Sequence, residues 1–166
     1  DDFHCPQEEE ATISMLKLGP IPSLDDVNPS VNDESKEEIL IWDEKGRSKL
    51  TQMFISYDTD NVMFMDGGDT EYITAVSGSH GIRNYVTRAR RLTSLTIETN
   101  KGTYGPFGST KIEFNDKKFQ FSLGHSDQFG GFHGTSSPSF LTSIGVYLKP
   151  IQDLGSLCKK NDLHID

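Results

Sequence analysis

The sequence has no long hydrophobic run. Hydrophobic residues make up 34% of its 166 residues, and the mean hydropathy is −0.50. No segment approaches the roughly 20 apolar residues that a membrane-spanning helix needs, so we expect no membrane span. The length suits one domain with a core of its own. The polar balance favours a thin β-fold with long tails over a thick α/β core.

Positive charge is also scarce. The chain has 16 Lys and Arg residues against 25 Asp and Glu, which gives a net charge of −9 and an isoelectric point near 4.9. Nucleic-acid binding requires basic residues clustered against the phosphates, so we expect no nucleic-acid partner. The one basic cluster comprises Arg83, Arg88, Arg90 and Arg91. We interpret it as the solvated face of a strand and loop.

Cysteine is limited to Cys5 and Cys158, one towards each end of the chain. Two readings remain open, a disulfide in an oxidising compartment or two thiols in a reducing one. Sequons for N-glycosylation are missing, because Asn28 is followed by Pro29 and no other Asn fits the pattern. Asp1 stands where a Met would begin a chain, so we expect that a signal peptide, a propeptide or another preceding segment has been removed.

Motifs for catalysis, metals and cofactors are missing. No H-x-x-H or C-x-x-C spacing occurs, which argues against a dedicated metal site. Ser77 lacks the glycine two residues earlier that a nucleophile elbow has, and Gly105–Gly108 lacks the lysine of a phosphate loop. We therefore expect neither an enzyme nor a cofactor. We expect His133 to have a structural role and His125 to lie in a surface turn.

Helical periodicity of normal length is absent from the central part of the chain, and short strand patterns take its place. We expect an acidic tail over residues 1–12, one domain over 13–150 and a second tail over 151–166. Residues 21–38 are rich in Pro, Ser, Asn and Asp, which predicts a surface loop. The expected strands are Ile13–Leu18 (ended by Gly19-Pro20), Ile39–Trp42, Leu50–Tyr57, Val62–Met65, Glu71–Gly78, Leu92–Thr99, Lys111–Phe114, Lys118–Phe121 and Ser143–Leu148. Many short strands with Gly and Pro turns predict an all-β sandwich, barrel or related form.

Four sequence phrases resemble one family. They are E-Y-I-T-A-V-S-G at residues 71–78, T-N-K-G-T-Y-G-P-F-G at 99–108, F-G-G-F-H-G at 129–134 and I-G-V-Y at 144–147. In the third phrase we expect Gly130 and Gly131 at a sharp corner or at a close approach to another strand. Together the phrases resemble the jacalin-related lectins, and the last two resemble plant jacalin-like proteins implicated in defence and in restricting virus movement.

The resemblance implies a β-prism I fold, in which three antiparallel sheets surround a common core. The span from Ile55 to Glu71 is short for that family, so we expect one sheet to be shortened. A tail or a second copy of the chain would then cover its edge, which makes a homo-oligomer an expectation. The resemblance also implies first and last strands in one sheet, so a Cys5–Cys158 disulfide is geometrically feasible. The resemblance and the missing sequons favour a cytoplasmic protein, whereas that disulfide would favour secretion.

The resemblance further implies a pyranose site between loops at one end of the prism. The family places a carboxylate there through a Gly-x-x-x-Asp phrase before the last strand, and this chain has Pro138 and Thr142 at those two positions. The expected partners are glycans of the mannose/glucose or galactose type, or other proteins if the site has lost sugar binding. Neutral sugars meet no electrostatic objection from an acidic chain. The candidate sugar-binding residues are Gly19, Ser79, His80, Gly81, Ser139, Phe140, Leu141 and Thr142.

Overall fold

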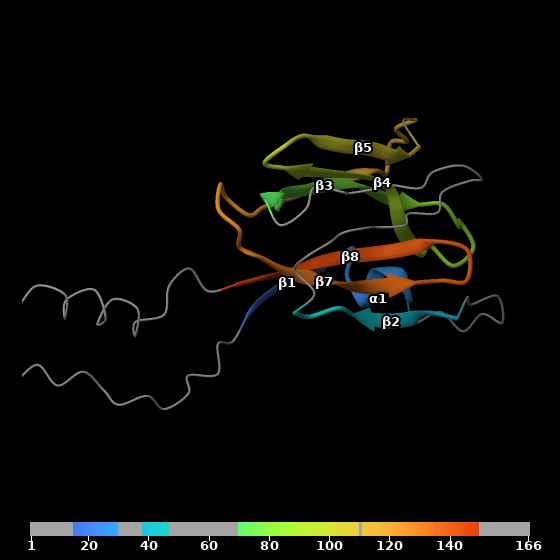
Figure 1. The fold of residues 1–166 in the computed structure, drawn as a ribbon. Coiled ribbons are helices and arrows are strands. Elements are labelled where there is room, and N and C mark those ends of the chain that lie inside the picture. The colour runs from blue at the N-terminus through green and yellow to red at the C-terminus, as the bar shows by residue number, and fades with distance from the viewer. Residues whose placement is uncertain (1–14, 30–37, 47–69, 110, 150–166) are drawn as a thin grey trace, which may run out of the picture.

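A computed structural model describes residues 15–29, 38–46, 70–109 and 111–149 of the chain (Figure 1). The strands expected at Leu50–Tyr57 and Val62–Met65 lie outside these residues. The two tails and both cysteines also lie outside them, as does most of the span in which a shortened sheet was expected.

The described residues form two four-stranded sheets in which every pairing is antiparallel. The first sheet has the order β1-β8-β7-β2 and the second has the order β5-β4-β3-β6. Its members in the first sheet are β1 (Leu16–Ile21), β2 (Leu40–Asp43), β7 (Phe129–Ser136) and β8 (Leu141–Leu148). Those in the second are β3 (Ile73–Ile82), β4 (Arg90–Thr99), β5 (Thr103–Gly108) and β6 (Lys117–Ser122). The expectation of an all-β fold is confirmed.

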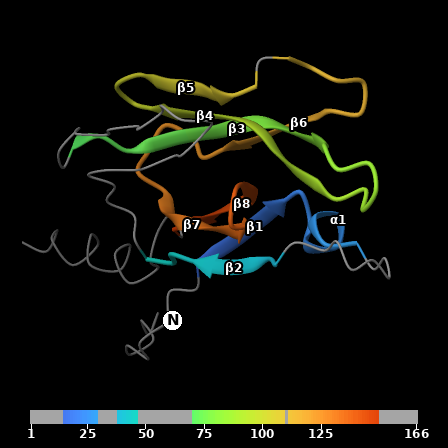
Figure 2. The same cartoon turned by 90° about the vertical axis from the view of Figure 1, so that its right-hand side faces the viewer.

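The two sheets face each other as layers, with the core between them (Figures 1 and 2). Strand β6 shows how the sequence builds this core, because Phe119 and Phe121 are buried while Lys118 and Gln120 are exposed. Each fully buried aromatic or aliphatic side chain contributes roughly 1.5–3 kcal/mol through burial. The core cluster consists of Ile73, Val76, Leu92, Leu95, Ile97, Phe119, Phe121, Leu123, Phe129, Phe132, Ile144 and Val146.

The first and last described strands pair in one sheet, as the family resemblance implies. Leu18 of β1 lies opposite Val146 of β8. Strand β1 continues through Gly19 and Pro20 to Ile21, so the expected end at Gly19-Pro20 is wrong. The ladder tolerates these residues because its register shifts between Leu18 and Ile21.

The expected surface loop after β1 contains α1 (Leu24–Val27), a single helical turn. Ser23 caps its start, since the backbone N–H of Asp26 donates to the Ser23 hydroxyl at 3.3 Å. Val27 at its end is buried. The loop is therefore partly anchored to the core rather than wholly on the surface.

The strand expected at Lys111–Phe114 is wrong. No strand covers these residues, and Phe114 is 97% exposed. The backbone N–H of Glu113 donates to the Asp116 carboxylate at 3.0 Å, and the N–H of Asp116 donates to the Glu113 carbonyl at 3.0 Å. These local hydrogen bonds form a turn and take the groups that a strand ladder would need.

The F-G-G-F-H-G phrase lies inside β7 rather than at a corner. β7 is a central strand between β8 and β2, and its glycines let neighbouring backbones approach closely. A Cβ added at Gly134 would collide with the carbonyl oxygen of Ser143, and one at Gly131 would collide with that of Glu44. The close-approach reading of these glycines is confirmed and the corner is wrong. His133 is buried in the same strand and contacts the Leu18 carbonyl oxygen through Nε2 at 2.8 Å.

Candidate ligand site

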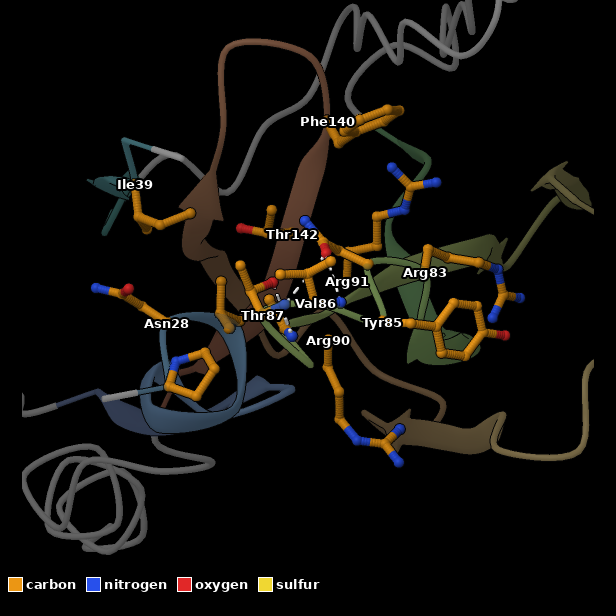
Figure 3. Close-up of a pocket in the computed structure, with 14 residues that line it drawn as sticks. Asn28, Ile39, Arg83, Tyr85, Val86, Thr87, Arg90, Arg91, Phe140 and Thr142 are labelled. Atoms are coloured by element: carbon orange, nitrogen blue, oxygen red, sulfur yellow. Dashed lines mark hydrogen bonds between the residues drawn. The ribbon is translucent and has the colours of Figure 1, made fainter. Parts of the chain in front are cut away.

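A cavity of about 490 Å³ opens at one end of the described structure (Figure 3). It is lined by residues 27–29 at the end of α1, by Ile39, by most of the segment 83–91, and by Phe140 and Thr142. We call it the end cavity. Its volume falls in the range of small-molecule sites, which are roughly 300–1,000 Å³.

The loop between β3 and β4 forms one wall of the end cavity and is fixed by its own hydrogen bonds. The Asn84 side-chain oxygen accepts from the N–H of Val86 at 3.0 Å and from that of Thr87 at 3.2 Å. The N–H of Arg88 donates to the Asn84 carbonyl at 2.9 Å, and Thr87 is buried. An Asn side chain that bonds to the following backbone defines a turn. The wall is therefore preformed.

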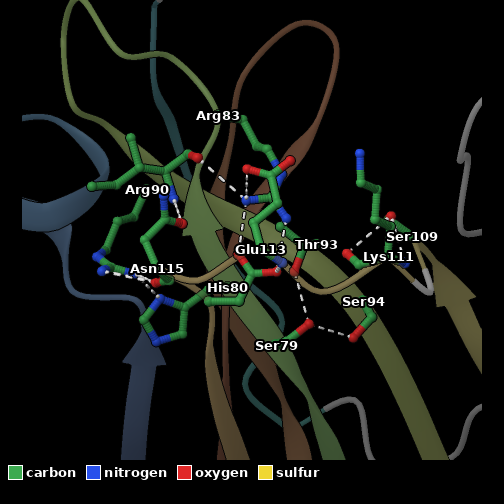
Figure 4. A network of polar contacts seen from close by, with 12 residues as sticks. Ser79, His80, Arg83, Arg90, Thr93, Ser94, Ser109, Lys111, Glu113 and Asn115 are labelled. Carbon is green, nitrogen blue, oxygen red and sulfur yellow. Dashed lines mark hydrogen bonds and ion pairs between the residues drawn. The ribbon is translucent and has the colours of Figure 1, made fainter.

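An ion-pair cluster, Arg83 with Glu113 and Asp116, holds this wall against the segment 111–116 (Figure 4). The Arg83 guanidinium donates to both Asp116 carboxylate oxygens, at 2.7 and 2.9 Å, and lies 3.5 Å from Glu113. Tyr85 donates to Glu113 at 3.0 Å. The hydrogen bonds from Arg83 lower the pKa of Asp116, and those same bonds raise the pKa of Arg83. We call this cluster the loop clamp.

Arg90 is held by neutral groups. Both of its terminal nitrogens donate to the Asn115 carbonyl oxygen at 3.3 Å, and Nη1 also lies 3.3 Å from Nδ1 of His80. Since arginine has no acceptor, Nδ1 of His80 accepts in this contact and the imidazole is neutral. Burial, and then the charge of Arg90, lower the pKa of His80. The Asn115 side chain accepts from the N–H of Ile82 at 3.2 Å.

Thr142 lies at the second position of β8 and is only 4% exposed. Its hydroxyl is 2.7 Å from the Thr135 hydroxyl, which in turn is 2.6 Å from that of Ser143. These three buried hydroxyls form one hydrogen-bonded chain. The residue at the expected acidic position is therefore neutral and already bonded to the protein.

Phe140 forms an exposed edge of the cavity. Its side chain is 38% exposed, and the guanidinium carbon of Arg91 lies 3.8 Å from the centroid of its ring. Figure 3 shows the Arg91 head group beside the Phe140 ring. This is a cation–π contact, which fixes the face of the guanidinium against the ring.

The structure brings Phe140 and Thr142 together in the end cavity, whereas the other six candidate residues do not line it. Ser79 lies within 2.7 Å of both the Thr93 and the Ser94 hydroxyls, and His80 contacts Arg90. The six are Gly19, Ser79, His80, Gly81, Ser139 and Leu141.

The sequence reasoning missed the part that the segment 83–91 plays in the cavity. The interpretation of its arginines as a solvated face is wrong for Arg83, whose side chain is 15% exposed and paired. It holds for Arg88, which is exposed. The signal that was present is four arginines facing two acids, but Glu113 and Asp116 lie 30 or more positions further along the chain.

Metals and membranes find no support in the described residues. Within 15–29, 38–46, 70–109 and 111–149, no group of three His, Cys, Asp or Glu side chains is placed to hold a metal ion. The helix in this part of the chain is too short to cross a membrane.

Comparisons with known proteins point to one family. The family described as "Jacalin-like lectin domain" matches residues 32–147. "Protein RESTRICTED TEV MOVEMENT 1" of Arabidopsis thaliana is 35% identical over 164 residues, covering 81% of this chain and 87% of that protein. "Jacalin-related lectin 2" of the same plant is 39% identical over 168 residues, covering 81% and 86%. A "Mannose/glucose-specific lectin" of Parkia platycephala is 35% identical over 81 residues, covering 49% of this chain and 17% of the lectin.

Proposed function

The chain belongs to the jacalin-like lectin domain family, and on that premise we propose that it binds carbohydrate in the end cavity. The observation that carries this proposal is that Phe140, Thr142 and the loop 83–89 line one cavity of small-molecule size. Thr142 occupies the position at which the family resemblance implies the sugar-binding carboxylate. A preformed concave site with an aromatic edge suits a pyranose ring.

The site binds neutral sugars weakly in this proposal. Thr142 offers no charged acceptor, and its hydroxyl is already bonded to Thr135. A hydrogen bond to a charged group contributes about 1.5–3 kcal/mol against about 1 for a neutral one. Losing that difference lowers affinity by roughly tenfold. Pro138 in the neighbouring loop also has no N–H to offer.

A second candidate function is protein interaction on the same scaffold without sugar binding, with a role in plant defence. The altered residue Thr142 supports it, and so does the Arabidopsis thaliana relative whose name refers to restricted TEV movement rather than to a sugar. The partner in that case is another protein, and the end cavity is a remnant of the family site.

A glycan array, followed by titration of the hits, tests the proposal. The informative variant is Phe140→Ala, which removes the exposed edge of the cavity. Its matched control is Phe114→Ala, which removes an aromatic ring that is 97% exposed and does not line the cavity.

We expect wild type and Phe114→Ala to bind the same glycans equally well, and Phe140→Ala to bind them at least severalfold more weakly. Binding that Phe140→Ala leaves unchanged would move the site elsewhere on the domain. An array without any hit would favour the protein-interaction function.

A further inference from the structure

We propose that the end cavity selects saccharides bearing an anionic group, either a uronic acid or a sulfated sugar, over their neutral counterparts. The inference rests on the proposed function, since it names the class of sugar that the same site would take. The shared chemistry is a pyranose with a carboxylate or sulfate attached.

The lining of the cavity is one-sided in charge. It includes Arg83, Arg90 and Arg91, whereas no Asp or Glu belongs to it. The floor position where the family resemblance implies a carboxylate is the neutral Thr142. A site built for neutral hydroxyls uses an acceptor such as a carboxylate, and that acceptor would repel an anion. Here the acceptor is missing and the repulsion is missing with it.

The three arginines contribute differently. The charge of Arg83 is balanced within the loop clamp by Asp116 and Glu113. Arg90 instead contacts the Asn115 carbonyl and the His80 ring, and within the described residues no carboxylate lies within 4 Å of it. Figure 4 shows its guanidinium directed towards His80 and Asn115. Arg90 therefore supplies positive potential behind the cavity wall rather than a direct contact.

Arg91 is placed to make the direct contact. Its guanidinium stacks on Phe140 at the edge of the cavity, with its carbon 3.8 Å from the ring centroid. Stacking engages the face of the planar group, whereas its five N–H donors lie in the plane and point outward. An in-plane guanidinium edge matches the two oxygens of a carboxylate or a sulfate. The same Phe140 ring is available as an apolar edge for the sugar.

The acidic net charge of the chain does not cancel this local field. The nearest acids on α1, Asp25 and Asp26, are exposed. Exposed charges are screened over about 8 Å at physiological salt, so distant acids act weakly on a ligand inside the cavity. The attraction to Arg91 should itself fall when salt is raised.

Isothermal titration calorimetry on the full chain tests the inference with a matched ligand set. The probes are methyl glucuronide, methyl glucoside, methyl glucoside 6-sulfate, and sodium acetate and sodium sulfate as anions without a sugar. We expect at least one charged glycoside to bind roughly tenfold more tightly than methyl glucoside. Raising NaCl from about 0.15 M to about 1 M should reduce that preference. Comparison of the two charged glycosides tells carboxylate from sulfate.

Variants assign the preference to the cavity. Arg91→Gln should abolish it, and Arg91→Lys should retain part of it, because lysine keeps the charge without the planar fork. The matched control is Arg88→Gln, which removes an exposed arginine of the same loop that does not line the cavity, and it should change nothing. Far-UV circular dichroism verifies that each variant is folded.

The outcomes separate the two proposals. Equal or tighter binding of methyl glucoside overturns the anionic preference and leaves carbohydrate binding standing. Acetate or sulfate that binds as tightly as the charged glycosides overturns selection of a saccharide. A preference that survives in Arg91→Gln places its source outside the cavity and overturns the inference. Failure of every glycoside, charged or neutral, on the array and in the calorimeter overturns the proposed function itself.

Discussion

The hydroxyl of Thr142 lies 2.7 Å from that of Thr135, so the floor of the end cavity is tied into the sheet by a buried hydroxyl chain. Thr142 is on β8 and Thr135 is on β7, the two central strands of the first sheet. The residue therefore serves the fold at a position where the family resemblance implies a ligand-binding acid. This relationship explains how a cavity persists with its chemistry changed.

The loop clamp should contribute to stability. Replacing Arg83 with Gln leaves the Asp116 carboxylate, which is 4% exposed, without its two charge-assisted hydrogen bonds. We expect the free energy of unfolding to fall by about 2 kcal/mol, because hydrogen bonds to charged groups contribute about 1.5–3 kcal/mol. Urea unfolding of the folded variant measures the change.

A matched control for the loop clamp is the exposed pair between Lys149 and Asp127, which lie 3.7 Å apart. Lys149→Gln should cost less than about 1 kcal/mol, because exposed ion pairs contribute little. Equal costs for Arg83→Gln and Lys149→Gln would contradict the role given to the loop clamp.

The stability that Asp116 contributes should depend on pH. Hydrogen bonds from Arg83 hold its folded-state pKa below the ordinary value of 3.8. Its contribution is therefore present above that value and is lost as the pH falls through the lower folded-state pKa. We expect the difference in unfolding free energy between wild type and Asp116→Asn to be constant at neutral pH and to shrink in more acidic solution, below the ordinary value. A difference that grows on acidification would show that the folded-state pKa is raised instead.

Gly134 should not tolerate a side chain. A Cβ there would collide with the Ser143 carbonyl oxygen and crowd the Trp42 ring, and a backbone atom in a central strand cannot move aside cheaply. Gly134→Ala should lower the free energy of unfolding by about 1–3 kcal/mol or more. Gly102→Ala is the control, because a Cβ at Gly102 meets nothing within 4 Å. Thermal unfolding of the pair decides, and similar melting temperatures would contradict the close approach.

Strand alternation in the sequence predicted burial well where tertiary packing agreed with it. Phe119 and Phe121 in β6 are buried as the pattern indicates. The similar alternation of Ile112 and Phe114 failed, because four residues of alternation do not distinguish a strand from a turn. The carboxylate of Asp116, whose bond to the Glu113 N–H decides the conformation, lies outside the pattern.

The candidate site was found only in part for a comparable reason. The family resemblance pointed to Phe140 and Thr142, which lie next to each other along β8 and its preceding loop. It did not identify Arg91 as a cavity residue, because the stacking of Arg91 on Phe140 joins positions far apart in the sequence. The glycines of β7 were ambiguous until the neighbouring strands were placed around them.

Restoring the acid should reverse the preference for charge. The variant Thr142→Asp with Pro138→Gly places a carboxylate at the cavity floor and returns an N–H to the neighbouring loop. A carboxylate there accepts hydrogen bonds from neutral sugar hydroxyls and repels an anionic group. The controls are Thr142→Asn with Pro138→Gly, which is uncharged, and Ser139→Asp, which adds an acid to an exposed position that does not line the cavity.

The most direct test is therefore the ratio of the affinities for methyl glucuronide and methyl glucoside, measured by calorimetry on wild type and on the Thr142→Asp, Pro138→Gly variant. We predict that wild type favours the charged glycoside by roughly tenfold and that the folded variant favours the neutral one. The same ratio in both folded proteins would show that the end cavity does not govern ligand binding.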